Sequence, residues 1–73
     1  MLITQVIFCP PDIEGAEWRA DITLLGHIII KGLHITKDNE IIYPSNMQPV
    51  NSTVDRILRS QILNFYWDFK HPN

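Results

Sequence analysis

The chain has 73 residues and a formal net charge of −2 at neutral pH. This length has room for one domain, whose single small core is only marginally stable alone, so pairing of two chains is a sensible way to bury more apolar surface. The acidic balance excludes the class of strongly basic domains, in which the whole molecule attracts phosphates.

The first predicted element is a strand in LITQVIF, at residues 2–8, which is rich in strand-forming residues. The segment CPPDIEG follows at residues 9–15, and its adjacent prolines have no backbone N–H to donate to a strand ladder. We therefore expect an exposed loop there. Cys9 is the one cysteine of the chain and cannot form an intramolecular disulfide, which is compatible with a reducing cytosol.

A hairpin is predicted next, from WRADITLL at residues 18–25 and HIIIKGLHIT at residues 27–36, with a turn around Gly26. We predict the register that pairs Ile22 with Ile30, since a one-residue slip would bring Lys31 beside Ile22. The side chains expected on the apolar face are Trp18, Ala20, Ile22, Leu24, Ile28 and Ile30. Those expected on a solvated face are Arg19, Asp21, Thr23 and Lys31.

A second hairpin is predicted at Asp38-Asn39, where the chain turns and EIIYP, residues 40–44, returns antiparallel to the preceding strand. An amphipathic helix follows from Thr53 to Lys70, with Ser52 as its expected N-cap and Asp55 at the capping-box position. The face expected to be buried comprises Val54, Ile57, Leu58, Gln61, Ile62 and Phe65. Residues 1–73 are thus predicted to form one α+β domain: a small antiparallel sheet of about four strands in two hairpins, with one C-terminal helix packed on it.

Several segments, taken in order, resemble the stage V sporulation protein G (SpoVG) family of septation regulators. DITLLGHIIIKGLHI, IIYPSN and QPVNSTVDRILRSQILNFY are similar to the family's ITL-type strand and the strand after it, its Pro-Ser, its His-Pro-Ile-Asn-Ser and its helix ending near Asn-x-Tyr. ITQVIF at residues 3–8 resembles the family's first strand, so the resemblance covers nearly the whole chain. It implies a homodimer that binds nucleic acid as a regulator of sporulation and cell division in the bacterial cytoplasm.

The chain departs from this family at basic positions. The family's Lys-Arg pair after Pro-Ser is replaced here by Asn46-Met47, and the loop that follows is much shorter. The family's first strand tends to end in basic residues, whereas residues 8–10 here are FCP. Only Arg19 and His34 match basic positions of the family well.

The residues predicted to contact nucleic acid are Arg19, Lys31, His34, Arg56 and Arg59. Arg56 and Arg59 lie three residues apart on the solvent face of the predicted helix, and arginine suits bidentate contact with phosphate. The alternative is simple solvation, with Asp55 paired to Arg59 at i, i+4. Asp21 can similarly neutralise Arg19 or Lys31. Residues 53–70 carry three basic against two acidic residues, a net charge of +1 and a weak electrostatic footprint.

A homodimer interface is expected at two places. One is the sheet edge at EIIYP, with Ile41 and Tyr43, and the other is the set of aromatic side chains outside the helix stripe, Tyr66, Trp67 and Phe69. Exposed aromatic residues also stack on bases, but in a chain this short we favour a place in the core or the interface. Two functions fit these features. One is a nucleic-acid-binding regulatory homodimer, and the other is a homodimeric protein-interaction module that has lost nucleic-acid binding.

Other functions find no support in the sequence. His27 and His34 are an odd number of residues apart, so on one strand they point to opposite faces and cannot share a metal ion. No paired carboxylates, nucleophile–base pair or phosphate-binding glycine loop can be assembled, so we expect no enzyme, no cofactor and no small-molecule substrate. The sequence has no secretory signal and no membrane-spanning run, so we expect a cytoplasmic protein without membrane contact.

Overall fold

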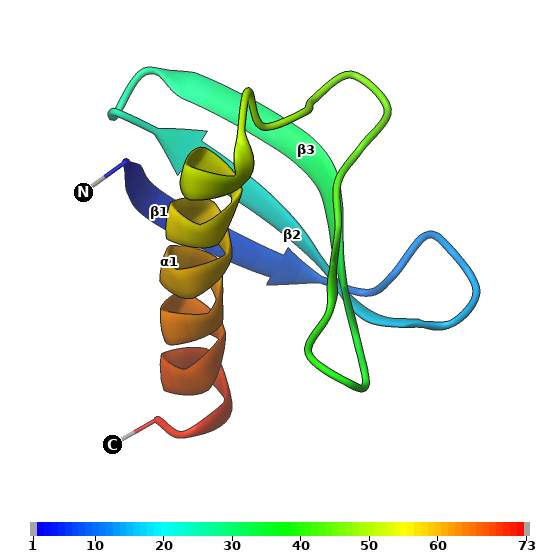
Figure 1. The fold of residues 1–73 in the computed structure, drawn as a ribbon. Helices are drawn as coiled ribbons and strands as arrows, with labels where there is room; N and C mark the ends of the chain where they lie inside the picture. Colours follow the sequence, from blue (N-terminus) through cyan, green and yellow to red (C-terminus); the bar gives the residue numbers. More distant parts are fainter. Residues whose placement is uncertain (1, 73) are drawn as a thin grey trace.

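The computed structural model describes residues 2–72, which form one antiparallel sheet and one helix. The strands follow the chain order across the sheet: β1 (Ile3–Cys9), β2 (Ala16–Leu24), β3 (Ile28–Thr36) and β4 (Ile41–Ile42). The helix α1 (Ser52–Lys70) lies against one face of this sheet (Figure 1). The predicted α+β fold is therefore confirmed. In residues 2–72, no helix combines the length and apolar character needed to cross a membrane.

Both predicted turns are present. The Leu24–His27 turn has φ values of 52° at Leu25 and 72° at Gly26, the left-handed geometry that matches the twist of hairpin strands. At the second turn Asn39 has φ 63°, and its N–H donates to the Thr36 carbonyl at 3.0 Å. The strand that follows is shorter than EIIYP, because only Ile41–Ile42 pair with β3.

The predicted register of the first hairpin is confirmed, since Ile22 faces Ile30. A β-bulge follows at Gly32, where the residues from Ile30 to Leu33 span only Ala20–Ile22 of β2. Gly32 has φ 92°, a conformation that costs glycine little. Beyond the bulge the side chains of β3 alternate in the opposite sense, so Leu33 and the isoleucine two positions later point into the core.

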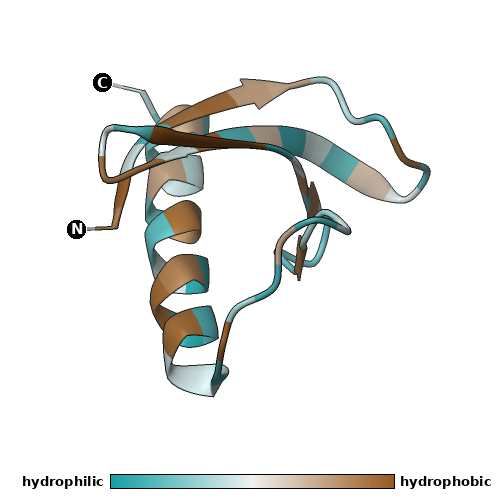
Figure 2. Cartoon of the chain, turned by 90° about the horizontal axis from the view of Figure 1, so that it is seen from above, coloured by the Kyte–Doolittle hydropathy of each residue, from teal (hydrophilic) through white to brown (hydrophobic). Residues whose placement is uncertain are grey.

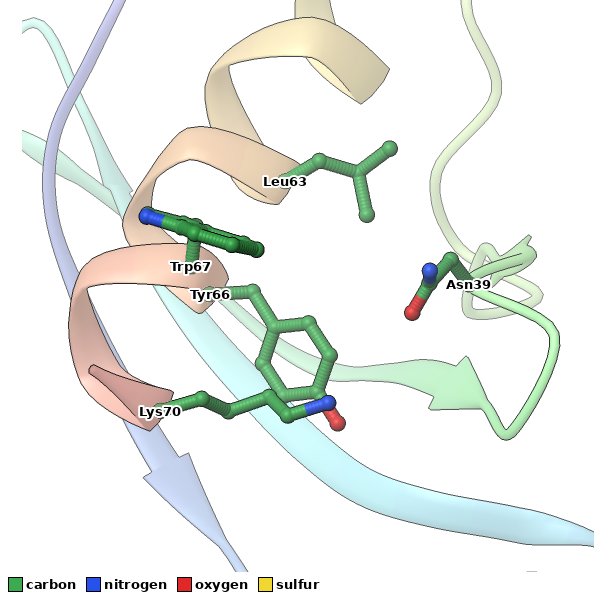
Figure 3. Close-up of a pocket in the computed structure, with 5 residues that line it drawn as sticks. All are labelled: Asn39, Leu63, Tyr66, Trp67 and Lys70. Carbon is green, nitrogen blue, oxygen red and sulfur yellow. The ribbon is translucent and has the colours of Figure 1, made fainter.

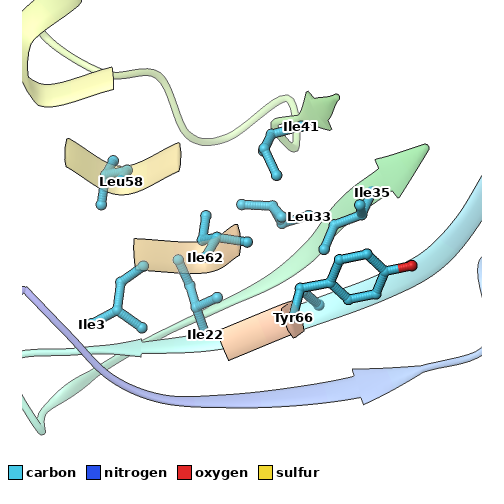
Figure 4. Close-up of a cluster of buried hydrophobic side chains, with 9 residues drawn as sticks. Ile3, Ile22, Leu33, Ile35, Ile41, Leu58, Ile62 and Tyr66 are labelled. Atoms are coloured by element: carbon cyan, nitrogen blue, oxygen red, sulfur yellow. The ribbon is translucent and has the colours of Figure 1, made fainter. Parts of the chain in front are cut away.

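The core lies between the sheet and α1 (Figure 4). Its buried members are Ile3, Ala20, Ile22, Leu33, Ile35, Ile41, Leu58, Ile62 and Tyr66. Full burial of one such aliphatic side chain stabilises the fold by about 1.5–3 kcal/mol. Beside this core, Phe69 stacks on Phe8 with ring centroids 4.6 Å apart and meets Trp18 edge-on at 4.9 Å. Figure 2 shows that the strands and α1 carry most of the hydrophobic residues, while the connecting loops are largely hydrophilic.

The structure corrects two details of the predicted helix. The N-cap is Asn51, not Ser52, because the Asn51 side chain accepts a hydrogen bond from the Val54 N–H at 2.9 Å. The buried face is also rotated from the prediction, since Ile57 is 40% exposed whereas Tyr66 is only 3% exposed. The buried residues of α1 are four apart in sequence, a ridge that packs against a sheet as a unit: Leu58, Ile62 and Tyr66.

Candidate nucleic-acid interface

Arg19 lies on the sheet face opposite α1, where two carboxylates neutralise it. Its guanidinium donates to Asp12 at 2.9 Å and to Asp21 at 3.2 Å. The hydrogen bond to Asp12 is the largest cause of a raised Arg19 pKa. Because its charge is already balanced twice, Arg19 contributes no excess positive potential toward a phosphate.

His34 is buried beneath the loop that joins β1 to β2, with 4% of its surface exposed. Its Nε2 accepts a 3.2 Å hydrogen bond from the Asp12 N–H, and its Nδ1 lies 3.0 Å from the Gly32 carbonyl oxygen. These partners assign the proton to Nδ1. The His34 ring ties the loop to the sheet and has no exposed surface for a phosphate. The prediction that His34 contacts nucleic acid is therefore not supported by its position.

Within residues 2–72, Lys31 and His27 make no hydrogen bond or salt bridge with Arg19. Lys31 is exposed next to the β3 bulge and makes no salt bridge within residues 2–72. His27 lies in the turn before β3 rather than on the strand with His34. Across the same described part of the chain, no group of three or more metal-ligating side chains could hold an ion.

The two helix arginines share one flank of α1 with three other residues. Arg56, Arg59, Leu63, Trp67 and Lys70 are spaced three or four apart, so their side chains form a continuous row on the helix surface. We name these five residues the basic-aromatic stripe. It carries three positive charges along about 21 Å of helix axis. Sequence reasoning missed Leu63 and Lys70 as members, although the spacing alone places them there.

Arg59 forms the i, i+4 pair with Asp55 that is the predicted alternative to phosphate contact. Its Nε lies 2.9 Å from both carboxylate oxygens of Asp55, and its guanidinium carbon lies 5.7 Å from the Tyr43 ring centroid. The pair occupies Nε alone, so the two terminal amino groups have no hydrogen-bond partner among residues 2–72. Arg56, one turn earlier, is exposed and makes no salt bridge with these residues. Both side chains therefore keep donors available for an anion.

A pocket of about 190 Å³ lies between the second half of the stripe and the β3–β4 turn (Figure 3). Its lining residues are Asn39, Leu63, Tyr66, Trp67 and Lys70. Trp67 is 64% exposed, and the His71 ring stacks on its indole with centroids 3.8 Å apart. The Lys70 ammonium lies 4.9 Å from the Tyr66 ring centroid, a cation–π contact that holds it at the pocket. An exposed aromatic ring is thus flanked by a fixed cation.

Of the five residues predicted for a dimer interface, some are buried within their own chain and others are exposed. Ile41 and Tyr66 are buried in the core of their own chain, so their side chains have no surface to offer a second chain. The Tyr43 hydroxyl is held within the chain by Asp55, and Phe69, 41% exposed, packs on Phe8. Trp67 keeps the most free surface of the five. Sequence reasoning missed Asn39 and His71. Asn39 gave no local signal because only the fold brings it to the pocket, whereas His71 could have been found from its spacing, four residues after Trp67.

Comparison with protein-family models, curated proteins and solved structures finds no match for this chain.

Proposed function

We propose that this protein is a small homodimeric regulator that binds nucleic acid in the bacterial cytoplasm. The observation that carries the proposal is the basic-aromatic stripe, which aligns three cations and an exposed indole on one flank of α1. Arginine and lysine supply phosphate contacts that fix a protein on nucleic acid without reading its sequence. The resemblance to the SpoVG family points to the same activity.

The charge distribution makes this activity local and salt-sensitive. The net charge of −2 gives no attraction over the molecule as a whole, so binding depends on the stripe. Much of the acidic excess lies elsewhere, in and around the β1–β2 loop, at Asp12, Glu14 and Asp21. Glu17 is nearer to α1, since its carboxylate accepts a 3.2 Å hydrogen bond from the Tyr66 hydroxyl. The stripe has only three cations, and one of them, Arg59, is paired with Asp55, so affinity falls as salt screens or competes for them.

Open strand edges support the dimeric part of the proposal. β1 pairs with β2 on one side only, and β4 covers β3 only at His34 and Ile35. The β3 residues before the bulge therefore lie at a second edge, and Ile29 there is 65% exposed. Unpaired edges with exposed apolar side chains favour pairing with another chain.

The test is a titration of the purified protein against labelled duplex DNA and single-stranded RNA at two salt concentrations. The double variant Arg56→Ala/Arg59→Ala should weaken binding to all sequences alike and flatten the salt dependence by up to about two counterions' worth of slope. Asp55→Asn should strengthen binding modestly, because it releases Arg59 from its partner. Lys31→Ala is the control, since it removes a positive charge outside the stripe.

The proposal fails if the wild-type protein binds neither nucleic acid at low salt, where the electrostatic attraction is greatest. An effect of Lys31→Ala as large as that of the double variant would instead move the contact surface away from the stripe.

One observation favours the second candidate function, a homodimeric protein-interaction module. The sheet face opposite α1 has its arginine neutralised and exposes three isoleucines, Ile7, Ile29 and Ile42, by 54%, 65% and 41%. An exposed apolar surface with a balanced charge suits a protein partner better than a phosphate backbone. This function gains support if the protein is a dimer that binds no nucleic acid at low salt.

A further inference from the structure

We propose that the pocket beside Trp67 holds an unpaired base, so that the ligand of this protein is single-stranded nucleic acid. This inference rests on the proposed function and deepens it. The pocket itself is small, and the inference depends on the aromatic, basic and amide side chains that line it.

The Trp67 indole is the stacking surface. His71 covers one face of the ring, with an interplanar angle of 25°, yet the side chain as a whole remains 64% exposed. Trp67 also lines the pocket, so an exposed part of the indole is available to a base that enters it. Bases stack on such rings whatever their sequence, because every base has a π-face.

The charge around the pocket selects a base attached to phosphate over an apolar protein side chain. Lys70 lies at the pocket, and Arg59 and Arg56 continue the row of cations along the helix away from it. A strand with one base in the pocket can therefore run its phosphates along the stripe. This combination of an aromatic platform with a track of cations is typical of single-strand binding.

Asn39 adds a polar group on the far side of the pocket from the helix (Figure 3). Its side-chain amide has both donor and acceptor atoms and makes no hydrogen bond to another residue in the described part of the chain. Such an amide can bond to the edge of an unstacked base. In a duplex, each base is stacked between its neighbours and paired, so the same ring and amide reach no base without unpairing it.

The experiment compares an oligothymidylate, an oligouridylate and a duplex of equal length at low salt. The wild-type protein should bind the single strands more tightly than the duplex. Trp67→Ala should lower single-strand affinity by about 5- to 100-fold and leave the salt slope unchanged, because no cation is lost. Trp67→Phe, which keeps an aromatic ring, should recover much of that affinity. The two oligonucleotides show whether the sugar matters.

Fluorescence provides a readout that a merely structural role of Trp67 would not produce. The chain has two tryptophans, so Trp18→Phe leaves Trp67 as the sole reporter. Adding oligothymidylate should quench its emission by stacking, whereas the Trp67→Phe protein, which reports on Trp18 alone, should change little.

Equal binding of single strands by wild type and Trp67→Ala, or a preference for the duplex, would overturn the base-binding inference while phosphate binding stands. A flatter salt dependence in Arg56→Ala/Arg59→Ala, with Trp67 still quenched by saturating oligothymidylate, would support both. Absence of binding to all three probes would refute the proposed function and, with it, this inference.

Discussion

The Tyr43 hydroxyl donates a 2.8 Å hydrogen bond to the carboxylate of Asp55, which joins the segment after β4 to the first turn of α1. The same carboxylate accepts from Arg59 of the stripe. Burial, followed by this hydrogen bond, raises the pKa of Tyr43 to about 12. In turn the Tyr43 hydrogen bond is the largest single cause of the lowered pKa of Asp55, and the Arg59 pair lowers it further. The network therefore couples the orientation of the stripe to the stability of the fold.

This network predicts a specific loss of stability in alkali. Because the folded pKa of Tyr43 lies above the ordinary tyrosine value of 10.0, the contribution of Tyr43 to stability is complete below that pH and is lost as the pH rises through about 12. Tyr43→Phe lacks this group, so the wild type should lose stability faster than the variant over that range. Urea midpoints of both proteins at several pH values measure the difference. Tyr66, whose pKa is also raised, is present in both proteins and cancels. Parallel curves would contradict the prediction.

Asp55 predicts the opposite dependence in acid. Its folded pKa is lowered from 3.8, so its contribution is present above that value and is lost as the pH falls through the folded pKa. Asp55→Asn removes this titration. The wild type should therefore approach the stability of the variant as the pH is lowered, as followed by urea unfolding. A gap that stays constant down to low pH would show that the Asp55 contacts contribute nothing through its charge.

Two isoleucines of α1 test which helix face is buried. Ile62 is fully buried, so Ile62→Ala should lower the free energy of unfolding by about 2–5 kcal/mol. Ile57 is 40% exposed, and Ile57→Ala removes the same atoms with a much smaller loss. Chemical denaturation of both variants measures the contrast. Equal losses would mean that the helix is rotated toward the face predicted from the sequence.

The N-terminus of α1 gives a third stability prediction. Asn51→Ala removes the side chain that accepts from Val54 N–H and should cost about 1 kcal/mol. Ser52→Ala is the matched control, because Ser52 is the first residue within the helix and is exposed. Thermal or urea unfolding compares the two. A larger loss for Ser52→Ala would restore the capping pattern predicted from the sequence.

The predicted homodimer can be tested by measuring the molecular mass of the protein in solution. If the open edges of β1 and β3 pair two chains, light scattering at micromolar concentration should give about twice the 8.5 kDa of one chain. Dilution should then reveal monomers only at lower concentration. A clean monomer at micromolar concentration would remove the dimer from both candidate functions.

The sequence by itself determined the features that depend on short-range chemistry. The turn residues Gly26 and Asn39 tolerate positive φ, and the separation of polar from apolar residues selects the register that pairs Ile22 with Ile30. Helix periodicity similarly predicts α1 as far as Lys70. Even the basic-aromatic stripe follows from spacing, since Arg56 and Lys70 lie on one flank of any helix with this sequence.

The tertiary structure decided what depends on residues distant in sequence. Glycine inside a strand often marks a bulge, yet only the pairing with β2 shows that Gly32 reverses the alternation and sends Leu33 inward. Packing against the sheet decides which ridge of the apolar helix is buried, and in this fold Tyr66 is buried whereas Ile57 is exposed.

The surroundings of Arg19 and His34 on the sheet were likewise decided by the tertiary structure. Asp12 reaches Arg19 and His34 only because the β1–β2 loop folds back over that face. Electrostatic and hydrogen-bond energies depend on distances in space, which the path of the chain creates. Spacing along a helix is fixed by its geometry and is readable from sequence, whereas a loop returning to a sheet has no such period. For this reason the row of residues on one flank of α1 follows from the sequence, and so does the nearby Asp21, whereas the contact of Arg19 with Asp12 does not.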